Sequence, residues 1–161
     1  MTQLAELFKK DLVTNFGPDK MLPDLTFAEM EPGWDCGGGT YTITKEEVEK
    51  FARLMGDANT GAANVPVGML YIFGLRICWD RKVFIDQAVR AGDRITFHKP
   101  AKIGDTITTK LSVADKKEVQ KEKDGKVRIN KFLFINMNAT NQDGDKIADV
   151  RMSFLLPRTM Q

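Results

Sequence analysis

The sequence has few cysteines and a single histidine. Its 161 residues include two cysteines, Cys36 and Cys78, which are too few for a disulfide framework. No histidine lies near either cysteine in the sequence, so we expect two small buried side chains rather than nucleophiles. This cysteine usage is typical of a reduced, cytoplasmic protein.

Long hydrophobic runs and a strong net charge are also missing. The longest apolar run, 65–79, is interrupted by Arg76 and is too short to span a bilayer. The first 12 residues carry charged side chains and lack the apolar stretch of a signal peptide. The net charge of +2 is too small to indicate nucleic acid or an anionic membrane as a partner. We therefore expect a cytoplasmic protein with no nucleic-acid and no membrane partner.

The composition is that of an ordinary globular chain, with 42% hydrophobic and 29% charged residues. Without repeats or a linker, residues 1–161 are expected to form one domain with a sizeable core. Its first part, about 1–40, is predicted to hold a helix at 3–16 on the spacing of its apolar residues. A Pro- and Gly-rich wrapping loop follows over 17–39, with a short strand near 25–27.

A second helix is predicted to begin after Thr44. Thr44 and Glu47 form a capping box, in which the threonine hydroxyl accepts from a backbone amide and the glutamate reaches back. The helix follows a brief strand at 41–43 and is expected to end at Gly56, a natural left-handed cap. It would deliver Asp57 into a loop, where a carboxylate can point into a cleft.

A strongly apolar helix is predicted over residues 66–79. Pro66 suits its first turn, where the missing amide proton has no cost. The helix is apolar nearly all round, so it should be buried on most sides. Gly68 and Gly74 would allow close approach of another backbone.

The second half of the sequence is typical of antiparallel strands. Four segments alternate or run apolar: 93–99, 105–114, 126–139 and 146–156. Asp124-Gly125 and Asp143-Gly144 mark hairpin turns. The charge-dense stretch 116–126 mixes both signs, which predicts a solvated hairpin tip rather than a binding patch. Together the elements predict an α+β domain with a helix on one sheet face.

Three segments, in order, resemble the MaoC-like branch of the hotdog fold, the (R)-specific enoyl-thioester hydratases and dehydratases. They are residues 51–59, 68–70 and 97–105, and the last resembles the family's Phe-x-x-Pro-Val-x-x-Gly-Asp segment. The resemblance covers about residues 24–157. It implies a hotdog fold, in which an antiparallel sheet wraps around the central apolar helix.

The resemblance also implies roles for individual residues. Water is a poor nucleophile at neutral pH and requires a base, and the developing enolate oxygen requires a donor. The family's pattern makes Asp57 the catalytic carboxylate, Asn59 the residue that orients water or the loop, and Gly68 the amide donor to the thioester carbonyl. The substrate-binding residues that it implies are Asn64, Val67 and Met69.

The sequence departs from the family's Asp-x-Asn-Pro-x-His motif. Thr60 replaces the proline and Ala62 stands where the catalytic histidine is expected. The segment up to Pro66 is also shorter than in typical relatives, which predicts a more open site. His98, the only histidine in the sequence, is expected to be an exposed or interface side chain.

Three functions therefore remain open. The chain is a hydratase or dehydratase, a catalytically silent acyl-CoA-binding subunit of a heteromeric hydratase, or a repurposed thioesterase or ligand-binding protein. The acyl thioester brings its own coenzyme A or acyl carrier protein, and we expect no further cofactor and no metal. Because a hotdog sheet leaves one edge uncovered, we expect a homodimer, or a heteromer with a catalytically complete subunit.

Overall fold

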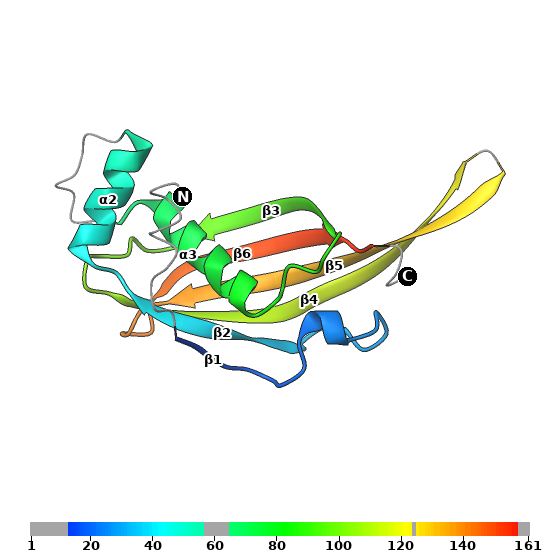
Figure 1. Cartoon of the computed structure of the whole chain (residues 1–161), viewed down its shortest axis with the longest axis horizontal. Coiled ribbons are helices and arrows are strands. Elements are labelled where there is room, and N and C mark those ends of the chain that lie inside the picture. The colour runs from blue at the N-terminus through cyan, green and yellow to red at the C-terminus, as the bar shows by residue number, and fades with distance from the viewer. Residues whose placement is uncertain (1–12, 57–64, 124, 158–161) are drawn as a thin grey trace.

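The computed structural model describes residues 13–56, 65–123 and 125–157. One six-stranded antiparallel sheet, in the order β1-β2-β4-β5-β6-β3, curves around α3 (Figure 1). Its elements are β1 (Val13–Phe16), a 3-10 helix (Leu22–Asp24), β2 (Asp35–Thr42), α2 (Lys45–Met55), α3 (Val67–Asp80), β3 (Val89–Phe97), β4 (Thr106–Lys123), β5 (Lys126–Thr140) and β6 (Lys146–Leu155). This confirms the predicted α+β hotdog fold. None of the helices in these ranges is long and apolar enough to cross a membrane.

The central helix α3 lies where the apolar run predicted it. Phe73 and Ile77 are almost fully buried against the sheet, and the Phe73 ring packs 4.9 Å, centroid to centroid, from that of Tyr41 on β2. The remaining buried side chains of the helix are Met69, Leu70 and Cys78. These positions recur every three to four residues and therefore lie on one side of the helix, whereas Trp79 on the other side is 69% exposed. The helix is thus buried where it faces the sheet, and the prediction that it is buried on most sides is wrong for the described chain.

Helix α2 begins and ends as the local sequence predicts. The Glu47 amide donates to Thr44 Oγ1 at 3.4 Å, and the Thr44 amide donates to Glu47 Oε2 at 2.9 Å. At the other end Gly56 has φ +71°, a left-handed conformation that glycine adopts without steric cost. The capping box therefore determines where α2 begins, and Gly56 determines where it ends.

The long strands bury alternate side chains against α3. On β6 the predicted apolar face is buried, with Val150 and Met152 3% and 0% exposed. The hairpin glycines Gly125 and Gly144 have φ +69° and +80°, as the predicted turns require. Strand β3 forms one edge of the sheet and pairs only with β6 in the described chain.

Two expectations for the residues before β2 are wrong. Residues 13–16, the end of the predicted 3–16 helix, form β1, which pairs with β2 through Val13 opposite Thr40. The free edge of β2 supplies backbone partners that override the helical spacing. The strand near 25–27 is instead a turn after the 3-10 helix, where the Thr26 amide donates to Glu29 Oε2 at 2.7 Å. The rest of the predicted helix, 3–12, lies outside the described residues.

The predicted wrapping loop also ends early. Strand β2 begins at Asp35 and includes the glycine triplet 37–39, which was predicted as loop. Gly37 has φ +81° and lies at a register shift between β2 and β4. A Cβ built on Gly17 would lie only 2.4 Å from the Cα of Gly37. Glycine therefore serves a bulge and a close backbone approach inside the strand, rather than a loop. Strand β4 likewise continues to Lys123, beyond the predicted end at 114.

Candidate functional site

The first turn of α3 exposes backbone donors. Met69 N and Leu70 N donate to Pro66 O at 3.0 and 3.4 Å, whereas Val67 and Gly68 have no acceptor one turn earlier within the helix. Val67 is 54% exposed and Gly68 is also exposed, while Met69 is buried directly beneath. The positive end of the helix dipole adds to these amides. The turn is thus suited to hold a developing oxyanion.

Helix α2 packs against this first turn. A Cβ built on Gly68 would lie 3.5 Å from Cζ of Phe51, an ordinary contact distance. Gly56, the C-cap of α2, immediately precedes Asp57. The described chain resumes at Val65, whose amide donates to Ala101 O at 2.9 Å. Both anchors of the intervening segment are therefore described.

The predicted residues between these anchors are not among those described. Asp57, Asn59 and Asn64 lie outside the described residues, as do Thr60 and Ala62. Their roles stay predictions. Of the predicted site residues, Val67, Gly68 and Met69 are described, and they lie together at the start of α3.

A narrow cavity lies between α3 and the sheet, and its first lining residue on the helix is Leu70. Its volume is about 10 Å³, room for about one water molecule. It is lined by Leu70, Tyr71, Gly74, Ile95, Phe97, Thr109, Met137, Ala139, Ala148 and Val150. This lining is almost entirely apolar, so the cavity suits a hydrocarbon group.

Three residues of this cavity determine its size and polarity. A Cβ on Gly74 would lie 2.6 Å from Cε of Met137, so the methionine occupies space that the glycine leaves. Thr109 is 1% exposed, and its hydroxyl has no hydrogen-bond partner in the described part of the chain. Sequence reasoning missed this cavity because its residues come from separate elements.

A polar cluster joins α3 to the edge strand β3. Arg90 Nε donates to Asp93 Oδ1 at 2.9 Å, and its Nη2 donates to Tyr71 Oη at 2.6 Å, while the phenol donates to Asp93. Burial, and then the bond to Asp93, raises the pKa of Tyr71 to about 12. Tyr71 is therefore a neutral donor at pH 7. In the sequence, the signal that could have indicated this cluster is the hydroxyl of Tyr71 within a mostly apolar helix.

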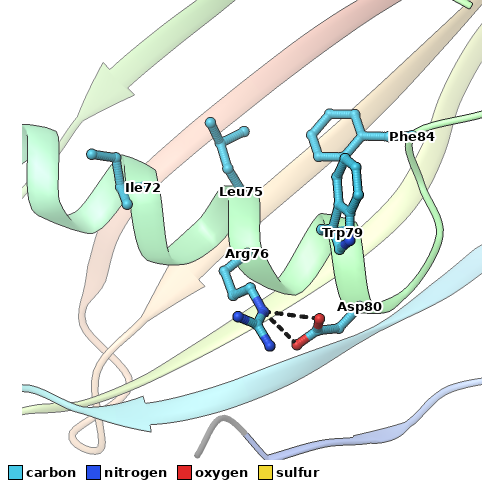
Figure 2. A pocket seen from close by; sticks show the side chains of 6 residues that line it. All are labelled: Ile72, Leu75, Arg76, Trp79, Asp80 and Phe84. Carbon is cyan, nitrogen blue, oxygen red and sulfur yellow. Dashed lines mark hydrogen bonds and ion pairs between the residues drawn. The ribbon is translucent and has the colours of Figure 1, made fainter. Parts of the chain in front are cut away.

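A second hollow lies on the face of α3 that turns away from the sheet (Figure 2). Its volume is about 520 Å³, and it is lined by Ile72, Leu75, Arg76, Trp79, Asp80 and Phe84. Arg76 Nε pairs with Asp80 Oδ1 at 2.9 Å, and Trp79 is 69% exposed. The hollow lies toward the opposite end of α3 from Gly68.

His98 lies on the outer face of the sheet, as an exposed side chain. Its Nε2 is 2.7 Å from Asp149 Oδ2, and Asn138 Nδ2 donates to Asp149 Oδ1 at 2.6 Å. The Asn138 amide, with smaller contributions from His98 and Lys146, lowers the pKa of Asp149 to about 2. Histidine and carboxylate thus pair with each other on the face opposite α3.

The low pKa of Asp149 predicts an acid-sensitive contribution to stability. The carboxyl titrates near 3.8 when unfolded and about 2 when folded, so its stabilisation is present above pH ~4 and is lost as pH falls through 2. We expect Asp149→Asn to lower the free energy of unfolding at pH 6 by up to ~1 kcal/mol and to leave it unchanged near pH 2. Urea unfolding at several pH values, with Glu46→Gln as control, measures this; a pH-independent difference would contradict it.

Both cysteines are free and buried, as predicted. Burial raises the pKa of each thiol, Cys36 and Cys78, to about 12, so both are protonated at neutral pH. Cys78 Sγ donates to the sulfur of Met137 at 3.8 Å. Neither is a nucleophile. Among the described residues, no group of three histidine, cysteine or acidic side chains is arranged to hold a metal.

Comparison with solved structures shows the same architecture. A monoamine oxidase regulatory protein from Archaeoglobus fulgius aligns with a TM-score of 0.65 at 18% identity, over 82% of this chain and 94% of that one. The MaoC-like dehydratase from Rhodospirillum rubrum aligns with 0.61 at 11% identity, over 82% and 96%. The (R)-hydratase from A. caviae involved in PHA biosynthesis aligns with 0.59 at 18% identity, over 80% and 98%.

At these identities the structures establish the fold, and the family model establishes the family. No curated protein sequence matches the chain. Residues 31–150 match the model of the FAS1-like dehydratase domain region, which covers most of the chain and both anchors of the candidate site. The chain belongs to this FAS1-like dehydratase family, and its fold is the hotdog of the MaoC-like proteins and (R)-hydratases.

Proposed function

We propose that the chain adds water to trans-2-enoyl thioesters, or removes it in the reverse direction, at the start of α3. One observation carries the proposal: the exposed Gly68 lies in the first turn of the helix whose Leu70 and Tyr71, two and three residues further on, line an apolar cavity. A thioester needs this combination, because its carbonyl requires a donor and its hydrocarbon chain requires a dry space. Membership of a dehydratase family supports the reaction class.

Each predicted residue has a role in this reaction. The Asp57 carboxylate takes a proton from water as the oxygen adds to C3, and the Gly68 amide stabilises the enolate that forms. The same carboxyl then protonates C2, which restores the base. Asn59 orients the water, and the substrate contacts come from Asn64, Val67 and Met69. Coenzyme A or a carrier protein holds the acyl group, and no further cofactor takes part.

The size of the cavity favours short acyl chains. Its volume of about 10 Å³ leaves little room beyond Met137, which fills the space beside Gly74. We expect Met137→Ala to raise kcat/KM for octenoyl-CoA relative to crotonyl-CoA by about tenfold or more, because each methylene buried contributes ~0.8 kcal/mol. Met137→Leu, of similar volume, is the control. Equal chain-length profiles for wild type and Met137→Ala would contradict this account of the cavity.

The proposed assembly is a homodimer formed through the β3 edge. Every residue of β3 is exposed, and Val89 and Phe97 present apolar side chains, 60% and 42% exposed. An unpaired edge of this kind invites pairing with another strand. Gel filtration that gives only an 18.1 kDa species would contradict the proposal. The cytoplasmic location stays a prediction.

A specific observation also favours a silent subunit. Ala62 offers no proton chemistry at the position of the family's histidine, and loss of an acid/base partner costs about 10²–10⁴ in rate. In this alternative the chain shapes the acyl pocket while a related subunit supplies a complete Asp…His pair. A repurposed thioesterase or ligand-binding protein is the remaining candidate.

One assay distinguishes the three functions. The purified chain is mixed with crotonyl-CoA, and loss of the conjugated enoyl thioester is followed alongside release of free thiol. The proposed function predicts hydration to 3-hydroxybutyryl-CoA by the chain alone. Turnover that appears only after addition of a subunit with the complete motif would identify a silent partner. Thiol release would identify a thioesterase, and binding without turnover would identify a ligand-binding protein.

A further inference from the structure

The outer end of the β4–β5 hairpin projects beyond the rest of the sheet (Figure 1). We call this part, residues 116–123 and 126–131, the ribbon. Strand β2 pairs with β4 only as far as Ser112, and β6 pairs with β5 only from Phe132. A two-stranded hairpin without further strands is marginally stable in water. The ribbon therefore extends into solvent at an energetic disadvantage.

The ribbon also concentrates positive charge. Residues 116–131 contain seven lysines and arginines and three acids, which leaves 17 basic and 19 acidic side chains elsewhere. The ribbon region thus has a formal charge of +4 in a chain whose net charge is +2. Such asymmetry within one chain indicates a surface that attracts anions.

Strand alternation separates the two signs, although they are mixed along the sequence. Residues directly opposite each other share a face, and Lys116 is opposite Leu133, which is buried in the core. The inner face is therefore the face of Lys116, and it carries both acids of the described ribbon, Glu118 and Glu122. On this face Lys131 pairs with Glu118 at 3.7 Å.

Within the ribbon, the outer face carries cations and no described acid. Asp115, which adjoins the ribbon on this face, pairs with Arg151 at 3.4 Å. Lys121 is directly opposite Arg128, a like-charge pair that destabilises an antiparallel ladder. Lys117 and Lys126 lie on the same face, one toward the sheet and one toward the tip. All four side chains are exposed, and none forms an ion pair within the described residues. Cations that gather on one face of an arm without acidic partners there would be neutralised by a binding partner.

The chemistry of the ribbon favours an acidic protein segment as this partner. The exposed apolar side chains Val127 and Ile129 lie on the inner face, whereas a membrane-bound element needs cations and apolar groups directed to the same surface. A nucleic acid would extend past the ribbon onto a body with excess negative charge. An acidic strand or loop can instead match the two-residue spacing of Lys126 and Arg128, about 7 Å, with Lys121 beside Arg128.

We propose that the outer face of the ribbon docks an acidic segment of a partner protein. This goes beyond the proposed hydratase activity and does not depend on it. It replaces the expectation of a merely solvated hairpin tip with a surface of one charge sign. The docking surface is defined by Lys117, Lys121, Lys126 and Arg128.

A labelled peptide with glutamate at every second residue tests the proposal. At low salt we expect the full chain to bind it, and the double variant Lys121→Glu/Arg128→Glu to bind at least about tenfold more weakly. The matched control, Lys102→Glu/Lys110→Glu, has the same net charge and carries exposed substitutions outside the ribbon, so it should bind like wild type. A single Lys121→Glu should weaken binding while slowing amide exchange in the ribbon, because it creates an opposite-charge pair with Arg128.

Three outcomes would overturn the proposal. These are no binding of the peptide, equal loss in the ribbon and control variants, or binding of duplex DNA or anionic vesicles without the peptide. Circular dichroism of every variant checks the fold. Crotonyl-CoA turnover should be the same in the ribbon variants and wild type, so failure here is distinguishable from failure of the proposed activity.

Discussion

Asp57→Asn is expected to lower kcat/KM for crotonyl-CoA hydration by about 10²–10⁴-fold. The substitution keeps the shape of the side chain and removes its ability to take a proton from water. The effect should fall mainly on kcat, since the thioester still finds the Gly68 amide and the apolar cavity. Initial rates at several substrate concentrations measure it, with the exposed Asp86→Asn as the matched control.

An Asp57→Asn rate equal to that of wild type would remove Asp57 from the reaction. The polar cluster of Tyr71, Arg90 and Asp93 would then be the alternative source of an acid or base. These side chains are bonded to one another, and the raised pKa of Tyr71 keeps its phenol protonated. They are therefore less suited to accept a proton than the Asp57 carboxylate of the proposal.

The second large effect is expected at Gly68. Gly68→Pro removes the amide proton that would hold the carbonyl, and loss of one such donor costs about 10²–10³ in kcat. Proline is tolerated in the first turn of a helix, so the fold should remain. Gly68→Ala is the control, because it keeps the amide and its Cβ would meet Phe51 at 3.5 Å, an ordinary contact.

Comparison of the two Gly68 variants separates chemistry from packing. We expect Gly68→Ala to retain most of the wild-type rate and Gly68→Pro to lose it, with similar thermal unfolding for both. A loss of the same size in both variants would indicate that glycine serves close packing against α2 rather than donation. Full activity in Gly68→Pro would place the carbonyl elsewhere.

Elements determined by local chemistry could be predicted from the sequence. The Thr44/Glu47 capping box and Gly56 determine α2, and one apolar run determines α3. Alternation of apolar residues gave β6 and its buried face. In each case the signal lies within the element itself, so no knowledge of its neighbours was needed.

Elements determined by their neighbours could not be predicted. Residues 13–16 form a strand because β2 offers an edge, and the 37–39 glycines lie within a strand because β1 and β4 flank them. The narrow apolar cavity depends on Gly74, Thr109 and Met137, which are brought together by packing across α3, β4 and β5. A sequence pattern contains no record of such distant contacts.

The distribution of charge over the two faces of the ribbon could not be predicted from the sequence either. Along the sequence, charges of both signs such as Lys121 and Glu122 are adjacent, which predicts a solvated tip of mixed charge. Strand geometry places them on opposite faces, and the register sets Lys121 against Arg128. The surface of one sign therefore follows from pairing rather than from composition.

The ¹⁵N–¹H resonance of Gly68 during titration with butyryl-CoA tests the central claim most directly, because it reports the proposed carbonyl contact without requiring turnover. We predict a downfield shift of this amide proton that saturates with the ligand and is among the largest in the chain. Shifts confined to other regions, such as the hollow at Trp79, with Gly68 unchanged at saturation, would contradict the assignment of the site to the start of α3.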